Sequence, residues 1–257
     1  MRACIFVDGE NLRHSIVDLF SPGFSAAEYF PKTAAWQAFF DHLAAKCYGS
    51  TRLRTYWYAV EQVEFWPWRL PKKEIETLHK VLNKHEKTKL RIKSAPDGDK
   101  AALEIAEELE NERRKFEKRF EGWKNVQDGI AAQHDAVEFR RAGTIRYDLF
   151  EKDLGTEKAV DVKLGVDLLL LAEIYDLAII VSGDGDYVPA VRAIKDKGKR
   201  VVNVAFETRD GRLLPGGARA LSRITDSELL VKFADMKEFM FPSQPLGLRV
   251  DDQQGSP

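Results

Sequence analysis

Short apolar runs alternate along the chain with stretches in which apolar residues recur every three or four positions. Residues 3–7 and 177–181 are apolar throughout, and residues 200–206 are nearly so. Such runs are typical of strands buried on both faces, as in a parallel sheet. Helical spacing predicts helices from about Asn11 and over 33–47, 72–87, 160–175, 188–197 and 222–233. The alternation of strand and helix predicts an α/β fold with a mainly parallel sheet.

Other segments have less regular patterns. The aromatic-rich residues 53–60 and the segment 137–147 predict strands, and charged and apolar residues alternate over 89–95 as in a strand exposed on one face. Residues 151–158 have the composition of a turn-rich connection. In the expected helix over 160–175, the predicted core positions are Val162, Val166, Leu169, Leu170 and Ile174.

Residues 100–135 differ from the rest of the chain, because they are rich in Glu, Lys, Arg and Ala and contain no Pro. Apolar residues recur there every three or four positions, which predicts a long helix or a helical hairpin that Gly122 or Gly129 would break. We expect a helical insertion over about 97–136 that packs with one face solvated. The alternative is an arm that contacts a protein partner, a second copy of the chain or a nucleic acid.

Composition narrows the class of protein. Apolar residues make up 44% of the 257 residues, and 40 Lys and Arg stand against 41 Asp and Glu. This composition is typical of a globular protein. The balance of positive and negative charges argues against a uniformly basic DNA-coating protein. Membrane-spanning helices need about 20 apolar residues in succession, and the sequence has no such segment. We expect a cytoplasmic protein without a membrane contact, folded over 1–241 and followed by a disordered tail at 242–257.

Acidic side chains follow two of the predicted buried strands. Asp8 comes directly after the first strand, and Asp184 and Asp186 lie in a glycine-spaced turn after the strand at 177–181. Ligands bind outside the carboxyl ends of the strands in an open parallel sheet, so these acids should share one edge. Clustered carboxylates repel one another, and a divalent cation offsets that repulsion. Oxygen ligands of this kind favour Mg²⁺ or Mn²⁺.

A further acid lies at the start of the helix that precedes the second acidic strand. Asp161 has apolar neighbours on both sides, so its side chain is out of place there unless it reaches a site. Asp167 follows six residues later, about 240° further around an ideal helix. We therefore rank Asp167 below Asp161 as a site residue.

These acidic segments form three blocks in a fixed order. The blocks are FVDGEN at 6–11, VDV at 160–162 followed by Asp167, and VSGDGDY at 181–187. Together they resemble the signature of the NYN domain, in the LabA-like branch of the PIN-like nuclease superfamily. The resemblance covers roughly residues 1–60 and 138–235, and the segment at 97–136 is not part of the minimal pattern.

The resemblance implies a Rossmann-like three-layer α/β/α sandwich that cleaves phosphodiester bonds, usually of RNA, with Mg²⁺ or Mn²⁺. Transferred by position, the catalytic and metal-binding acids would be Asp8, Asp161, Asp184 and Asp186, with Asp167 as a weaker candidate. Asn11 and Ser182 would orient water, metal or phosphate. The expected function is a metal-dependent endoribonuclease acting on RNA, with DNA left open as a substrate.

Two other functions remain open at this stage. The chain could be a non-catalytic RNA- or protein-binding NYN module that uses the helical insertion for partners. It could also belong to another class of Mg²⁺-dependent phosphoryl-transfer folds. A haloacid-dehalogenase phosphatase needs a second Asp two residues after the first, and this chain has Glu10 there. Asn11 could simply cap the first helix.

A basic stretch and a group of aromatic residues are the candidates for contact with nucleic acid. Residues 72–93 carry eight Lys or Arg and three Glu, a net charge of +5. Phosphate binding and a solvated helix face explain this charge equally well. The aromatic candidates for base stacking are Trp57, Tyr58, Trp66 and Trp68. Core packing is the expected role of at least half of them.

Overall fold

The computed structural model describes residues 1–20, 30–215 and 219–241. The predicted tail at 242–257 lies outside the described residues. Two compact units make up the chain. The first unit contains Met1–Trp57, Val126–Phe139 and Leu164–Pro257, and the second contains Tyr58–Asn125 and Arg140–Lys163.

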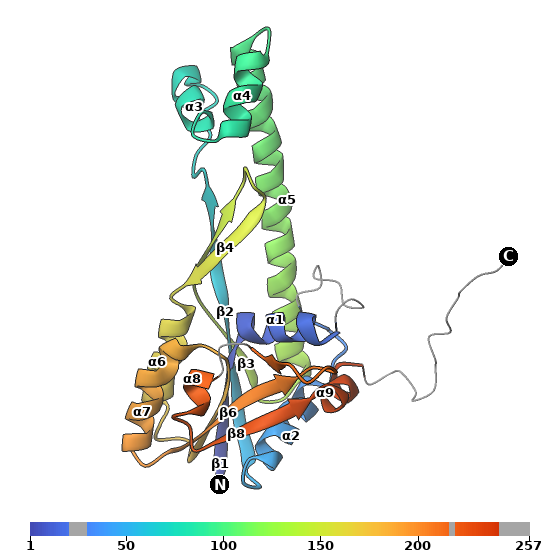
Figure 1. The fold of residues 1–257 in the computed structure, drawn as a ribbon, viewed down its shortest axis with the longest axis vertical. Helices are drawn as coiled ribbons and strands as arrows, with labels where there is room; N and C mark the ends of the chain where they lie inside the picture. Colours follow the sequence, from blue (N-terminus) through green and yellow to red (C-terminus); the bar gives the residue numbers. More distant parts are fainter. Residues whose placement is uncertain (21–29, 216–218, 242–257) are drawn as a thin grey trace, which may run out of the picture. The chain divides into compact units, whose positions relative to one another are not determined.

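A mainly parallel sheet forms the centre of the first unit (Figure 1). Strand β1 (Arg2–Asp8) pairs in parallel with β5 (Leu177–Val181), and β5 pairs in parallel with β6 (Arg200–Glu207). On its other side, β6 pairs in parallel with β8 (Ser227–Lys232) and briefly in antiparallel with β7 (Leu213–Leu214). The predicted α/β fold with a mainly parallel sheet is therefore confirmed.

Helices cover both faces of this sheet, which makes the first unit an α/β/α sandwich. The helices α2 (Trp36–Lys46) and α9 (Phe233–Met240) lie on one face (Figure 1). The other face is covered by α6 (Val160–Leu170) from Leu164 onward and by α7 (Val188–Asp196) (Figure 1). Because both faces are covered, β5 is buried at all five positions, as its apolar run predicts.

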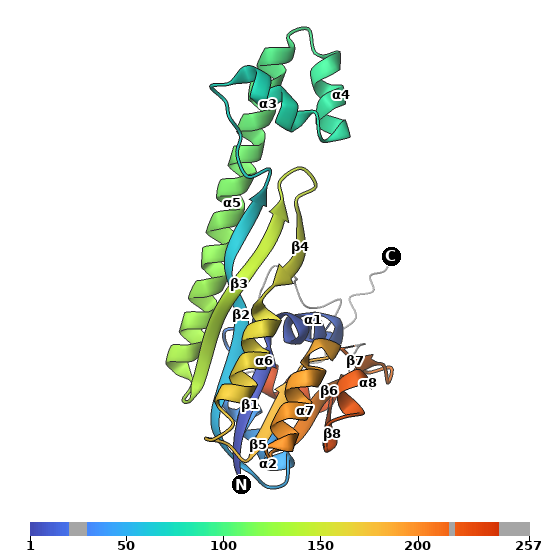
Figure 2. The ribbon, with the colours of Figure 1, turned by 90° about the vertical axis from the view of Figure 1, so that its left-hand side faces the viewer.

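The second unit contains three strands, three helices and the first turn of α6. Its strands are the later parts of β2 (Thr51–Trp66) and β3 (Val137–Asp148), together with β4 (Asp153–Lys158). Figure 2 shows these strands side by side in front of the long helix α5 (Gly98–Gln133). The short helices α3 (Ile75–Leu82) and α4 (Glu86–Ser94) complete the unit. The predicted long helix is confirmed, and α5 runs unbroken through Gly122 and Gly129, so neither glycine is a break point.

Three predicted segments adopt a different structure. Residues 89–94 belong to helix α4, which buries Ile92 and is tied to α5 by the ion pair of Arg91 with Glu108. The segment 151–158 contains the edge strand β4, whose charged residues suit a position at the edge of a sheet. Half of the predicted helix at 222–233 is strand β8, because pairing with buried β6 overrides its local pattern.

Helix α6 turns a different face to the core from the one that its spacing predicts. Leu164 and Leu168 are fully buried, whereas Val162, Val166, Leu170 and Ile174 are exposed. The stripe of apolar residues therefore does not mark the buried face of this helix. None of the helices in the described ranges has the length and hydropathy needed to cross a bilayer.

Candidate active site

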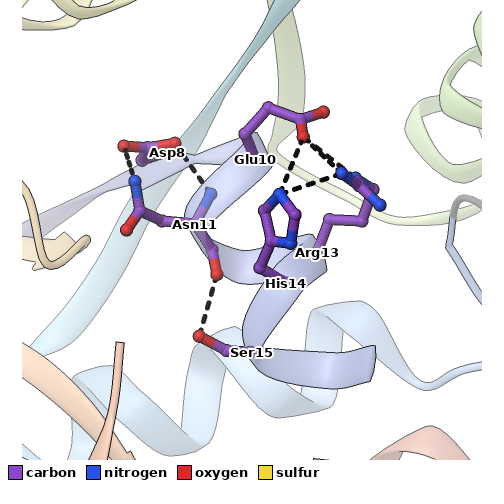
Figure 3. A network of polar contacts seen from close by, with 6 residues as sticks. All are labelled: Asp8, Glu10, Asn11, Arg13, His14 and Ser15. Atoms are coloured by element: carbon purple, nitrogen blue, oxygen red, sulfur yellow. Dashed lines mark hydrogen bonds and ion pairs between the residues drawn. The ribbon is translucent and has the colours of Figure 1, made fainter. Parts of the chain in front are cut away.

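Asp8 ends strand β1 and is fully buried. Helix α1 (Gly9–Phe20) begins at the next residue, and the backbone N–H of Asn11 donates to Asp8 Oδ1 at 3.0 Å (Figure 3). A carboxylate that accepts from the third residue of a helix is an N-cap. The cap of α1 is thus Asp8 and not Asn11, which corrects the capping alternative for Asn11.

The second carboxylate oxygen of Asp8 accepts three side-chain hydrogen bonds. Asn11 Nδ2 donates to Asp8 Oδ2 at 2.6 Å, Ser182 Oγ at 2.9 Å and Tyr187 Oη at 3.2 Å. Burial of an ionised carboxylate is strongly unfavourable unless hydrogen bonds replace its hydration. These donors provide that replacement, so Asp8 is a buried anchor on which residues from α1 and from the turn after β5 converge.

The turn after β5 is held by its own side chains and by Asn11. Ser182 Oγ accepts from the backbone N–H of Asp184 at 3.0 Å while it donates to Asp8. Asp184 Oδ1 accepts from the backbone N–H of Asp186 at 2.8 Å and so caps the short 3₁₀ helix η1 (Gly185–Tyr187). Asn11 Oδ1 accepts from the backbone N–H of Gly183 at 3.3 Å. Asn11 and Ser182 therefore both lie beside Asp8, and their role in orienting water, metal or phosphate stays a prediction.

Asp184 and Asp186 present their carboxylates close together. Each offers one carboxylate oxygen within 4.8 Å of the other's, and Asp184 is half-buried whereas Asp186 is exposed. Two negative charges at this separation repel each other. Their donor set consists of oxygen atoms alone, which fits Mg²⁺ or Mn²⁺ and does not fit a soft, thiolate-preferring metal.

The two predicted acids of α6 lie in different units. Asp167 belongs to the first unit and is buried on the face of α6 that carries Leu164 and Leu168. Asp161 is half-buried in the first turn of α6 and belongs to the second unit. It stays a prediction that Asp161 shares a site with the other acids.

Tyr187 is a member of the site that sequence reasoning missed. Its side chain is buried, and its hydroxyl donates to Asp8 Oδ2. The position of Tyr187 directly after the acidic turn could have indicated this role. However, a Tyr near the start of a helix is ordinarily a core residue, and its partner Asp8 lies 179 positions away in the sequence.

Glu10 forms a separate polar network on the first turns of α1 (Figure 3). Glu10 Oε2 accepts from Arg13 Nε at 3.0 Å and from Arg13 Nη2 at 2.7 Å, and His14 Nε2 lies 3.6 Å from the same oxygen. The Glu10 carboxylate is therefore paired with Arg13.

A family model and two solved structures are similar to parts of this chain. The model of the NYN domain matches residues 100–215. This confirms the predicted resemblance over 138–215, and the match also takes in residues 100–136, which the prediction left out of the pattern. The match includes Asp161, Asp184 and Asp186 and does not extend to Asp8. No curated protein matches the sequence.

The first of the solved structures is a protein of unknown function from Vibrio parahaemolyticus RIMD 2210633, with 15% identity and a TM-score of 0.43. The alignment covers 90% of this chain and 92% of that chain. The second is the T5 5′-exonuclease with bound zinc, with 16% identity and a TM-score of 0.34. It covers 74% of this chain and 52% of that chain. Both TM-scores are too low for either likeness to bear on the fold or function of this chain.

Proposed function

Taking residues 100–215 as an NYN domain, we propose that this protein is a metal-dependent endoribonuclease. The observation that carries the proposal is the pair of carboxylates of Asp184 and Asp186 at the carboxyl end of β5, on a turn fastened to buried Asp8 at the end of β1. In an open parallel sheet this edge is where ligands bind. The NYN resemblance supports phosphodiester cleavage and RNA as the substrate.

Asp184 and Asp186 would hold one or two Mg²⁺ or Mn²⁺ ions, which fit their oxygen donors. When bound, such an ion offsets charge on the phosphate oxygens and lowers the pKa of a bound water. Asp186 is the more exposed of the pair, and its carboxylate can accept the proton of the attacking water. Asp161 is proposed as a third acid of this set, and Asp167, which is buried, remains a weaker candidate.

Asp8, Asn11 and Ser182 would act by positioning. Ser182 Oγ is bonded to Asp8 on one side and to the backbone of Asp184 on the other, so the Asp8 carboxylate determines where the turn lies. Asn11 holds the same turn through Gly183. Preorganised positions of this kind are effective because no reorganisation is needed when the reaction takes place. The metal-ligand role that the NYN resemblance implies for Asp8 is the alternative to this positioning role, and Mn²⁺ binding distinguishes the two.

Cleavage assays test the proposal. Labelled single-stranded RNA, structured RNA and DNA are incubated with the protein in Mg²⁺, Mn²⁺ or EDTA. We expect RNA cleavage that EDTA abolishes and that Asp184→Asn and Asp186→Asn each reduce by about 100-fold or more, as for the loss of an electrostatic stabiliser. Asp196→Asn is the matched control, because it removes the same charge from an exposed position at the end of α7.

The proposal is wrong if cleavage persists in EDTA and in both site variants. RNA binding without cleavage under any metal condition would instead favour the non-catalytic module.

A further inference from the structure

One face of the three-stranded sheet in the second unit is packed and the other is open. Side chains alternate between faces along a strand. Phe65 and Tyr147 point to α5, where the Phe116 ring lies 6.1 Å from that of Phe65 and 3.9 Å from that of Tyr147. The neighbours Trp66 and Arg146 therefore project from the face turned away from α5. Figure 2 shows β2, β3 and β4, the strands that form this face.

A pocket of about 330 Å³ opens on this face. We call it the aromatic-basic pocket; its lining includes Trp66, Trp68, Thr144, Arg146, Thr156 and Lys158. Its volume lies at the lower end of the range for small-ligand sites. The aromatic rings offer stacking surfaces, and the threonine hydroxyls offer hydrogen-bond donors and acceptors.

The backbone around Trp68 is held in place, whereas the side chain of Trp68 is exposed. The exposed fraction of Trp68 is 70%, which is high for so large an apolar residue. Arg113 Nη2 donates to the backbone oxygens of Pro67 at 3.0 Å and Trp68 at 3.1 Å, and the carbonyl of Trp66 accepts from the N–H of Leu149 at 2.8 Å. The anchored backbone fixes where the exposed indole is presented, so little backbone entropy is lost when a ligand stacks on it.

Two cations lie over the Trp66 ring. Arg146 Cζ lies 4.6 Å and Lys84 Nζ 5.6 Å from the centre of the Trp66 ring. Lys158 is exposed at the rim of the pocket, where Glu64 is the one acid among the lining residues. The local charge is therefore positive beside two indole rings.

The basic stretch at 72–93 is less available than its composition indicates. Acids of the second unit pair with half of its eight basic residues, namely Lys72, Lys87, Lys89 and Arg91. Arg91 donates to both carboxylate oxygens of Glu108 on α5. These pairs neutralise much of the predicted phosphate-binding patch, whereas the aromatic-basic pocket keeps its positive charge.

We propose that the aromatic-basic pocket binds an unpaired nucleotide of single-stranded RNA. The base stacks on Trp68, and Arg146 and Lys158 contact the flanking phosphates. Stacking on an aromatic side chain requires a base free of its duplex partner, which is why the ligand is single-stranded. The choice of RNA rests on the proposed function, but binding to this pocket does not depend on cleavage.

Fluorescence anisotropy in EDTA tests the inference without cleavage. The probes are 5′-fluorescein-labelled dodecamers of uridine and of deoxyuridine, and a labelled 12-base-pair RNA duplex. We expect Trp68→Ala to weaken binding of the RNA single strand by about 5- to 150-fold, the range for one base stacked on an aromatic ring. Trp68→Phe keeps a ring and should keep most of the affinity. Lys158→Ala should weaken binding. It should also reduce the slope of log affinity against log salt concentration by the amount that corresponds to about one phosphate contact.

Lys118→Ala is the matched charge control, because Lys118 is exposed on α5. The inference is overturned if the single strand fails to bind, if it binds the pocket variants as it binds the wild type, or if Lys118→Ala lowers affinity and salt dependence as much as Lys158→Ala. It is also overturned if the duplex or the deoxyuridine strand binds as tightly and with the same sensitivity to Trp68→Ala. Binding that depends on Trp68 in a protein that cleaves nothing would support the pocket and contradict the nuclease.

Discussion

Ser182 Oγ donates a hydrogen bond to Asp8 Oδ2 at 2.9 Å, across 174 positions of sequence. Each residue directly follows one of a pair of opposed residues in parallel strands, Val7 in β1 and Val181 in β5. The bond therefore joins the carboxyl ends of two neighbouring strands. Because Ser182 also holds the backbone of Asp184, this hydroxyl links the acidic turn directly to Asp8, beside the bond of Asn11 to Gly183.

Removal of that hydroxyl should affect both stability and the site. In Ser182→Ala the buried Asp8 carboxylate loses one of its donors, so we expect the free energy of unfolding to fall by about 1–3 kcal/mol. Denaturant unfolding measures this change. Ser15→Ala is the control, because buried Ser15 donates only to the carbonyl of Asn11 within α1, and its loss should be close to neutral. Equal losses in both variants would contradict a special role for the bond between Ser182 and Asp8.

Binding of Mn²⁺ should distinguish a proposed metal ligand, Asp184, from a proposed positioning residue, Asp8. Asp184→Asn removes a proposed ligand, and we expect the affinity for Mn²⁺, measured by calorimetry, to fall about tenfold or more. Asp8→Asn should leave Mn²⁺ affinity nearly unchanged and lower stability by about 1–3 kcal/mol, because an amide nitrogen would face hydrogen-bond donors. If Asp8→Asn weakens Mn²⁺ binding as much as Asp184→Asn does, Asp8 is a ligand and not a positioning residue.

Two glycines of the second unit should respond to alanine in opposite directions. Gly143 in β3 has a φ of +67°, and a Cβ there would lie 1.9 Å from the carbonyl oxygen of Lys158. We expect Gly143→Ala to lower stability by about 2 kcal/mol or more. Gly122 lies inside α5, and a Cβ there would have nothing within 4 Å, so Gly122→Ala should raise stability by about 0.5–1 kcal/mol. Thermal unfolding checks both, and a stable Gly143→Ala would contradict the close approach of β3 and β4.

The free energy of unfolding should decrease at alkaline pH because of the buried thiol of Cys47. Burial raises the pKa of the Cys47 thiol to about 11. An unfolded cysteine ionises near pH 8.5, so its contribution to stability is complete below that pH and declines as pH rises toward 11. We expect Cys47→Ala to lose less stability than the wild type between pH 8 and pH 10, measured as the change in Tm. An equal loss in both proteins would mean that the thiol is not held protonated by the fold.

Sequence alone determined the main strands and the places of the acids. The apolar run at 177–181 matches β5 residue for residue, and Asp8 lies at the end of a buried strand and Asp184 after one, as expected. Burial on both faces leaves a continuous apolar run that can be read locally. An acid directly after such a run can also be recognised in the sequence as a candidate site residue, because its burial is favourable only with a partner or a ligand.

Only the tertiary structure decided how these residues are used. Trp57 and Tyr58 are buried in the core, whereas Trp68 is exposed, although all belong to one aromatic-rich stretch of sequence. Residues 227–232 form a strand because β6 offers them a pairing edge. Tyr187 joins the site because the fold brings it to Asp8. Periodicity reports which local conformation a segment prefers, whereas pairing, burial and hydrogen bonding between distant residues depend on contacts that form only in the folded chain.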